Sequence, residues 1–154
     1  MKNVVFVAPY LAETTLRFVS AVIRQPGARV TVLSRGPHDR LSPGLRERIA
    51  AFHRLAQGLD PQELAGAVAA AQRAWGRIDV LLGALEELQV PLGAIRDHLG
   101  IPGMSAATAE YFRDKSRIKR VLREAGVPWA RHALALDPAE ARAFAGAVVY
   151  PVIL

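Results

Sequence analysis

The feature that most constrains this chain is the pattern of strand, helix and strand in its first 34 residues. Residues 3–8, NVVFVA, form a β-branched and aromatic run without polar alternation, which is typical of a parallel strand buried on both faces. After Pro9, apolar residues repeat at helical spacing, namely Leu16, Val19, Val22 and Ile23. A second apolar run, ARVTVLS, follows at residues 28–34. Because the connections are tight, the pattern predicts a right-handed βαβ unit in a parallel sheet.

The same alternation continues as far as residue 99. A loop rich in Gly and Pro at residues 36–44 leads into a short helix at 42–50 and a short strand at 52–55. Asp60 and Pro61 favour a helix start, Glu63 occupies the capping-box position, and the helix extends to Trp75. Residues 78–83, IDVLLG, predict a fourth strand, and residues 88–99 a further helix. The fold class is therefore α/β, with a Rossmann-like parallel sheet of about four strands.

The turn after the first strand, APYLA at residues 8–12, lacks the G-x-G-x-x-G pattern of dinucleotide-binding proteins. Glycines are needed there to bring backbone amides against a pyrophosphate. We therefore expect the Rossmann-like topology without an NAD or FAD site.

Two glutamates, Glu86 and Glu87, follow the fourth predicted strand and precede a helix. Open parallel sheets place their ligand crevice at the carboxyl ends of the strands, and a helix N-terminus stabilises nearby carboxylates. The pair is interpreted either as support for the first helical turn or as part of a substrate cleft.

Residues 101–128 contain two short capped helices. Ser105 is a favourable N-cap for a helix at residues 106–112, and Asp114 for a second helix with Lys115 in its first turn. In that helix Ile118, Val121, Leu122 and Ala125 share one face. Gly126 and Pro128 end it. Beyond it, we expect a strand at residues 129–136, a helix at 139–145 and an apolar strand at 147–154.

This order of elements resembles the segment that opens the ATP-grasp fold. The matching pieces are FRDK at residues 112–115, EAGVP at 124–128 and YPVIL at 150–154, and the resemblance covers roughly residues 78–154. It implies a Rossmann-like pre-ATP-grasp domain at residues 1–103 and the incomplete start of the ATP-grasp small subdomain at 104–154. The parent protein would be an ATP-dependent ligase that activates a carboxylate as an acyl phosphate for attack by an amine or a thiol.

The resemblance also implies roles for individual residues. Lys115 would contact ATP phosphate, and Glu86 or Glu87 would line the substrate cleft. The full-length parent would use ATP and Mg²⁺, act on small-molecule carboxylate and amine substrates, and be compatible with a homodimer. The family's second lysine, glycine-rich loop and metal-binding carboxylates would follow residue 154. We therefore expect the 154-residue chain to be a truncated fragment, inactive by itself, that binds neither ATP nor Mg²⁺ tightly.

Composition limits the other functional classes. The chain has no cysteine, which excludes thiol nucleophiles and thiolate metal sites. Four scattered histidines and five serines without a G-x-S-x-G context indicate neither a metal site nor a serine hydrolase. The net charge of +6 raises a nucleic-acid hypothesis, but the basic residues are spread along the chain, so no nucleic-acid partner is expected. With neither a signal peptide nor an apolar span, we expect a cytoplasmic protein without membrane contact. The alternative to the ligase is a non-catalytic Rossmann-like module that binds a partner or a ligand.

Overall fold

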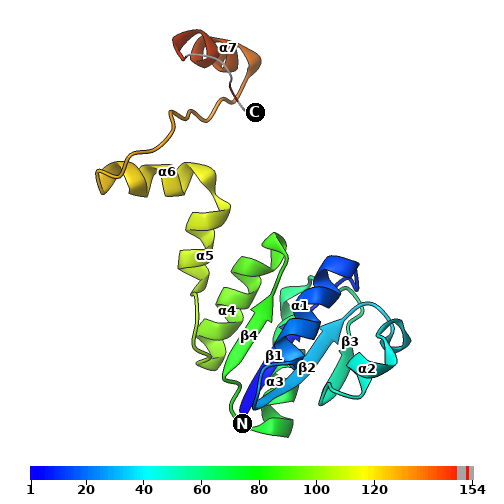
Figure 1. Cartoon of the computed structure of the whole chain (residues 1–154). Helices are drawn as coiled ribbons and strands as arrows, with labels where there is room; N and C mark the ends of the chain where they lie inside the picture. The colour runs from blue at the N-terminus through cyan, green and yellow to red at the C-terminus, as the bar shows by residue number, and fades with distance from the viewer. Residues whose placement is uncertain (149–151, 153–154) are drawn as a thin grey trace. The chain divides into compact units, whose positions relative to one another are not determined.

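Four parallel strands form the centre of the structure, in the order β3-β2-β1-β4 (Figure 1). The computed structural model describes residues 1–148 and 152. The strands span Lys2–Val7 (β1), Ala28–Ser34 (β2), Ala51–Arg54 (β3) and Val80–Gly83 (β4). Val4 of β1 lies opposite Val30 of β2 on one side and Val80 of β4 on the other. The predicted α/β class with a four-stranded parallel sheet is confirmed.

Both faces of the sheet are covered, as the continuous apolar run in β1 predicts. Val5 and Val7 lie in one buried cluster with residues of α3 (Pro61–Trp75) and α4 (Gln89–Leu99). Val4 and Phe6 lie in a second cluster with residues of α1 (Glu13–Ile23) and α2 (Pro43–Arg46). Because successive strand side chains point to opposite faces, one short run supplies both layers of the core.

The predicted cap of α3 is formed, but its second half differs from a capping box. The Asp60 carboxylate accepts a hydrogen bond from the Glu63 backbone N–H at 2.7 Å. In a capping box, the Glu63 carboxylate would return to the Asp60 N–H. It instead accepts hydrogen bonds from the backbone N–H groups of Ala56, Gln57 and Gly58. This carboxylate therefore fixes the loop after β3 as well as the start of α3.

Two helices follow the sheet domain at the predicted positions. α5 spans Ala106–Arg113, and the Ser105 hydroxyl accepts a hydrogen bond from the Thr108 N–H at 3.2 Å. α6 spans Lys115–Glu124, and Gly126, whose φ of 66° is left-handed, follows its C-cap Ala125. The chain divides into two compact units, Met1–Glu110 and Tyr111–Leu154. The functional boundary predicted after residue 103 stays a prediction.

The strand predicted at residues 129–136 is not formed. These residues lie between α6 and α7 (Pro138–Ala147) without regular structure. A strand needs a neighbour to pair its N–H and C=O groups, and the described residues of the Tyr111–Leu154 unit include no strand. The predicted partner at residues 147–154 falls mostly outside the described residues; Ala147 itself belongs to α7, which extends beyond the predicted end at residue 145.

Candidate functional site

The carboxyl ends of the four strands lie along one edge of the sheet, and a loop follows each of them. β1 is flanked by β2 on one side and β4 on the other, so the strand order reverses at β1. In open α/β sheets this reversal opens a crevice outside the strand ends, where ligands bind. The loops at this edge are therefore the expected location of a ligand-binding site.

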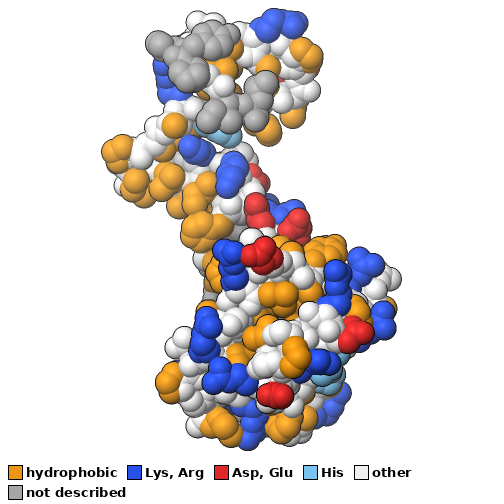
Figure 2. All heavy atoms as spheres, turned by 45° about the vertical axis from the view of Figure 1, so that its right-hand side comes forward, with side chains coloured by type: hydrophobic (Ala, Val, Ile, Leu, Met, Phe, Trp, Pro, Cys, Tyr) orange, Lys and Arg blue, Asp and Glu red, His pale blue; other side chains and the backbone are white. Residues whose placement is uncertain are grey.

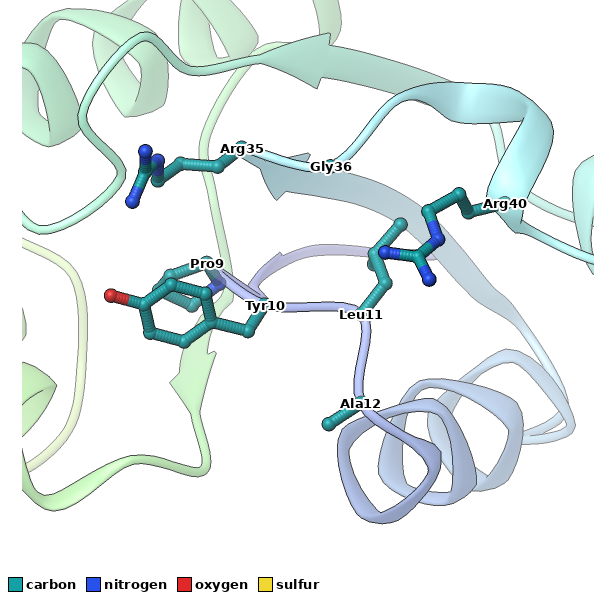
Figure 3. A pocket seen from close by; sticks show the side chains of 7 residues that line it. All are labelled: Pro9, Tyr10, Leu11, Ala12, Arg35, Gly36 and Arg40. Carbon is teal, nitrogen blue, oxygen red and sulfur yellow. The ribbon is translucent and has the colours of Figure 1, made fainter.

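A hollow of about 430 Å³ lies between the loops that follow β1 and β2 (Figure 3). The first loop contributes Pro9 to Ala12 to its lining, and the second contributes Arg35, Gly36 and Arg40. Arg35 extends along Pro9 and Tyr10, whereas the guanidinium of Arg40 points back toward Leu11 (Figure 3). Arg40 belongs to η1 (His38–Arg40), a 3₁₀ turn inside the segment predicted as a loop. The hollow thus combines an apolar wall with two cationic side chains.

Arg35 is held by contacts with the loops after β1 and β3. Its backbone N–H donates to the Pro9 carbonyl at 3.1 Å, which ties the ends of β1 and β2 together. Its guanidinium carbon lies 6.0 Å from the centre of the Tyr10 ring, within reach of a cation–π interaction. On the other side, its stem lies over Gly58, where a Cβ would be 2.8 Å from Cδ of Arg35. Glycine at position 58 therefore leaves room for the arginine.

The loop under Arg35 is itself fixed by Glu63. Hydrogen bonds from the backbone of Ala56, then Gly58 and Gln57, hold the pKa of Glu63 below its usual value, and the charge of Arg35 adds to this shift. A carboxylate that accepts several backbone hydrogen bonds is stabilised in its charged form. Glu63 is therefore ionised at neutral pH with its oxygens already bound.

A second hollow of about 450 Å³ lies beside the first and is lined by Arg35, Arg54, Leu55 and Ala56. Arg54 is the last residue of β3, and Arg35 directly follows β2. Arg35, Arg40 and Arg54 are not among the site residues predicted from the sequence. The positions of Arg35 and Arg54 at or just after the ends of two predicted strands could have indicated a shared edge.

Glu86 and Glu87 lie at the predicted place, between β4 and α4. They form η2 (Glu86–Leu88), a 3₁₀ turn that leads into α4, and both are exposed. Neither lines either of the two hollows. Because β4 and β2 lie on opposite sides of β1, the structure does not bring the glutamates together with the arginines.

Lys115 is the first residue of α6 and is exposed. The preceding Asp114 accepts hydrogen bonds from the Ser116 hydroxyl at 2.7 Å and from the Ser116 and Arg117 N–H groups. The Ser116 hydroxyl is the main cause that lowers the pKa of Asp114. The predicted cap is therefore formed, and it fixes the backbone of Lys115 at the helix N-terminus. Lys115 belongs to the Tyr111–Leu154 unit, whereas both hollows belong to the sheet unit.

The described residues do not by themselves fit a metal ion. Within residues 1–148 and 152, no group of three or more His, Asp and Glu side chains could hold one. Mg²⁺ prefers several oxygen ligands, so we derive no metal-dependent step from these residues. Among the same residues, no helix is long and apolar enough to cross a membrane.

Basic side chains do not gather on the face of the molecule in Figure 2. Lys and Arg are spread over it, with hydrophobic and acidic side chains between them. Nucleic-acid-binding proteins more often present a basic stripe or patch.

Comparisons with known proteins locate this architecture among solved structures. No protein-family model and no curated protein sequence matches the chain. Among solved structures, it is similar to an L-amino acid ligase from Bacillus licheniformis, with TM-score 0.59 and 17% identity over 83% of this chain. It is also similar to a phosphoribosylglycinamide synthetase from Anaerococcus prevotii, with TM-score 0.63 and 15% identity over 97% of this chain. A third match is the biotin carboxylase domain of a thermophilic 2-oxoglutarate carboxylase, with TM-score 0.66 and 17% identity over 99%.

The chain covers 31%, 35% and 34% of these three solved chains, so it spans about a third of their length. At this level of identity the likeness shows the fold. The resemblance to the ATP-grasp superfamily drawn from the sequence is thus confirmed as a likeness of fold.

Proposed function

We propose that this chain is the N-terminal part of an ATP-dependent ligase of the ATP-grasp type. The observation that carries the proposal is the agreement between the sequence motifs and the fold. The motifs at residues 112–115 and 124–128 resemble the opening of the ATP-grasp fold, and the fold itself matches a ligase, a synthetase and a carboxylase domain over most of the chain.

The proposed reaction has two steps. A carboxylate oxygen of the substrate takes the γ-phosphoryl group of ATP, which releases ADP and leaves an acyl phosphate. An amine, or a thiol, then attacks the acyl carbon, and inorganic phosphate leaves. The acyl phosphate has a better leaving group than the carboxylate, which makes the second step accessible. The groups that hold Mg²⁺ would have to come from outside the described residues.

Lys115 is the residue we propose for ATP phosphate. Its ammonium is a compact positive charge on a flexible stem, which suits the neutralisation of phosphate oxygens. Its exposure in the first turn of α6 supports the proposal, because the ammonium is open to a ligand. Glu86 and Glu87 are proposed to line the substrate cleft, supported by their exposure at the carboxyl end of β4 next to the switch point.

The test uses the full-length protein from its source cells and measures ADP release with a panel of carboxylates and amines. The proposal predicts ADP release that depends on a carboxylate. With that substrate, Lys115→Ala should lower kcat/KM at least about tenfold, because hydrogen bonds to charged groups are worth about 1.5–3 kcal/mol. Lys119→Ala is the matched control on the same helix; its ammonium lies 5.5 Å from the Trp129 ring centre, and the loss should stay within about twofold.

Two results would count against this assignment. Equal effects of Lys115→Ala and Lys119→Ala would remove Lys115 from the ATP site. No ADP release with any carboxylate would favour the alternative, a Rossmann-like module that binds a partner or ligand without catalysis. The predicted cytoplasmic location, the homodimer and the boundary after residue 103 remain parts of the proposal that need their own measurements.

A further inference from the structure

Three arginines gather at the carboxyl ends of β2 and β3. Arg35 and Arg40 line the first hollow, and Arg35 and Arg54 line the second. Arg35 is therefore common to both, with one further arginine on each side. We call Arg35, Arg40 and Arg54 the arginine site.

No carboxylate of a described residue forms an ion pair with any of the three arginines. Glu63 influences Arg35 electrostatically, but its oxygens accept backbone hydrogen bonds from residues 56–58. Asp39 is next to Arg40 in the chain and is exposed, yet it lines neither hollow. The site therefore carries an excess of positive charge at two hollows.

The central arginine is also held in place. The backbone of Arg35 is tied to the Pro9 carbonyl, and its side chain lies near the Tyr10 ring and over Gly58. Long exposed side chains normally lose rotamer freedom when they bind a ligand, which weakens binding. An arginine whose stem is already restricted loses less of this freedom.

We propose that the arginine site binds a phosphate group of a small-molecule ligand. The terminal oxygens of a phosphate face in different directions, so it can accept hydrogen bonds from guanidinium groups on separate loops. A single carboxylate has two oxygens in one plane and is matched by one guanidinium fork. Three arginines that form no ion pair with a described carboxylate, two in the loop after β2 and one at the end of β3, therefore favour a phosphate.

This assignment goes beyond the ligase function and does not rest on it. The arginine site lies within the Met1–Glu110 unit, whereas Lys115 lies in the other unit. Binding of inorganic phosphate can be measured on the 154-residue chain whether or not the full-length protein uses ATP.

The experiment is a titration of the ¹⁵N-labelled 154-residue chain with inorganic phosphate, followed by the backbone amide resonances in NMR. Succinate is the comparison ligand, because at pH 8 it carries a similar double charge on two planar carboxylates. Ionic strength is kept constant throughout, because screening weakens exposed charge interactions. The variants are Arg35→Ala, Arg40→Ala and Arg54→Ala. The matched control is Arg77→Ala, an exposed arginine at the opposite edge of the sheet, just before β4.

The proposal predicts saturable shifts at Arg35, Gly36 and Ala56, with phosphate bound more tightly than succinate. Arg35→Ala should weaken phosphate binding about tenfold or more, Arg40→Ala and Arg54→Ala less strongly, and Arg77→Ala within twofold. Circular dichroism shows whether each variant keeps its fold. If Arg35→Ala does not fold, Arg40→Ala and Arg54→Ala still test the site. Succinate binding as tight as phosphate binding would overturn the choice of phosphate. If phosphate binding does not saturate, or if Arg77→Ala weakens it as much as the site variants do, the proposed site is wrong.

Discussion

Substitution of Gly58 by alanine tests whether the space over this residue holds Arg35 in place. Gly58 has a φ of 77°, and Gly27 has a φ of 73°. A side chain in this left-handed region costs about 1–2 kcal/mol, so both Gly→Ala changes should lose that much stability. Nothing lies within 4 Å of a Cβ at Gly27, whereas a Cβ at Gly58 would lie 2.8 Å from Cδ of Arg35 and closer still to Cγ.

The additional cost at Gly58 follows from this overlap. Arg35 must leave its rotamer, which costs about 0.5–1.5 kcal/mol. We therefore expect Gly58→Ala to destabilise the chain by about 1.5–3.5 kcal/mol and Gly27→Ala by about 1–2 kcal/mol. Arg35→Ala removes Cγ and Cδ, so Gly58→Ala should then cost about as much as Gly27→Ala. The double-mutant cycle should give a coupling of about 0.5–1.5 kcal/mol between positions 35 and 58.

The assay is urea unfolding followed by circular dichroism at constant pH. Unfolding free energies are compared among variants that share the same dependence on urea concentration (the m-value). Phosphate binding provides a second readout, because displacement of Arg35 should weaken it in Gly58→Ala and leave it unchanged in Gly27→Ala. Equal losses of stability at the two glycines, with no coupling to Arg35→Ala, would refute the idea that Gly58 positions this arginine.

Four further predictions concern the sheet unit. Gly93→Ala should destabilise it by about 1–3 kcal/mol, because the new Cβ would lie 2.6 Å from the backbone N of Ala106. Gly66→Ala in α3, where nothing lies within 4 Å, should instead stabilise it by about 0.5–1 kcal/mol; urea unfolding that ranks the two glycines in the opposite order would contradict both. Leu92→Ala in the core should lower the free energy of unfolding by about 2–5 kcal/mol in the same assay. A loss below about 1 kcal/mol would contradict this and show that neighbouring side chains fill the cavity that Leu92 leaves. Backbone hydrogen bonds lower the pKa of Glu63 in the folded chain. Its contribution to the free energy of unfolding is therefore present above the unfolded pKa of about 4.3 and is lost as the pH falls through the folded pKa. Urea midpoints measured from pH 6 down to pH 3 should therefore fall less steeply in Glu63→Gln than in the unchanged chain.

Most elements of the sheet unit were predictable because each depends on residues that are close together in the sequence. Alternate residues of an apolar run such as residues 3–8 face opposite sides, so the run must be covered on both faces. The helix starts at Asp60 and Asp114 were predictable for a local reason, because each side chain accepts a backbone N–H within its own first turn. The strand order β3-β2-β1-β4 was not predicted, since any two of these apolar strands could pair their backbone groups.

The second unit and the arginine site show where local patterns fail. Residues 129–136, with mixed alternation, predict a strand, but a strand forms only with a partner, and none lies in the described part of this unit. Arg35 and Arg54 belong to the ends of different strands in the sequence, and their proximity depends on the pairing of β2 with β3. Glu63 was predicted as a helix cap, yet its carboxylate also reaches the loop after β3, which local spacing cannot reveal.

The central claim is that this chain is the N-terminal part of an ATP-dependent ligase, and the intact mass of the native protein tests it most directly. The protein would be purified from its source cells and measured by mass spectrometry against the 16.7 kDa of this chain. The account predicts a mass two to three times larger, because the chain covers about a third of the solved chains that it resembles. A native mass of 16.7 kDa would contradict the claim, because the 154 residues would then have to supply every group that binds ATP and Mg²⁺.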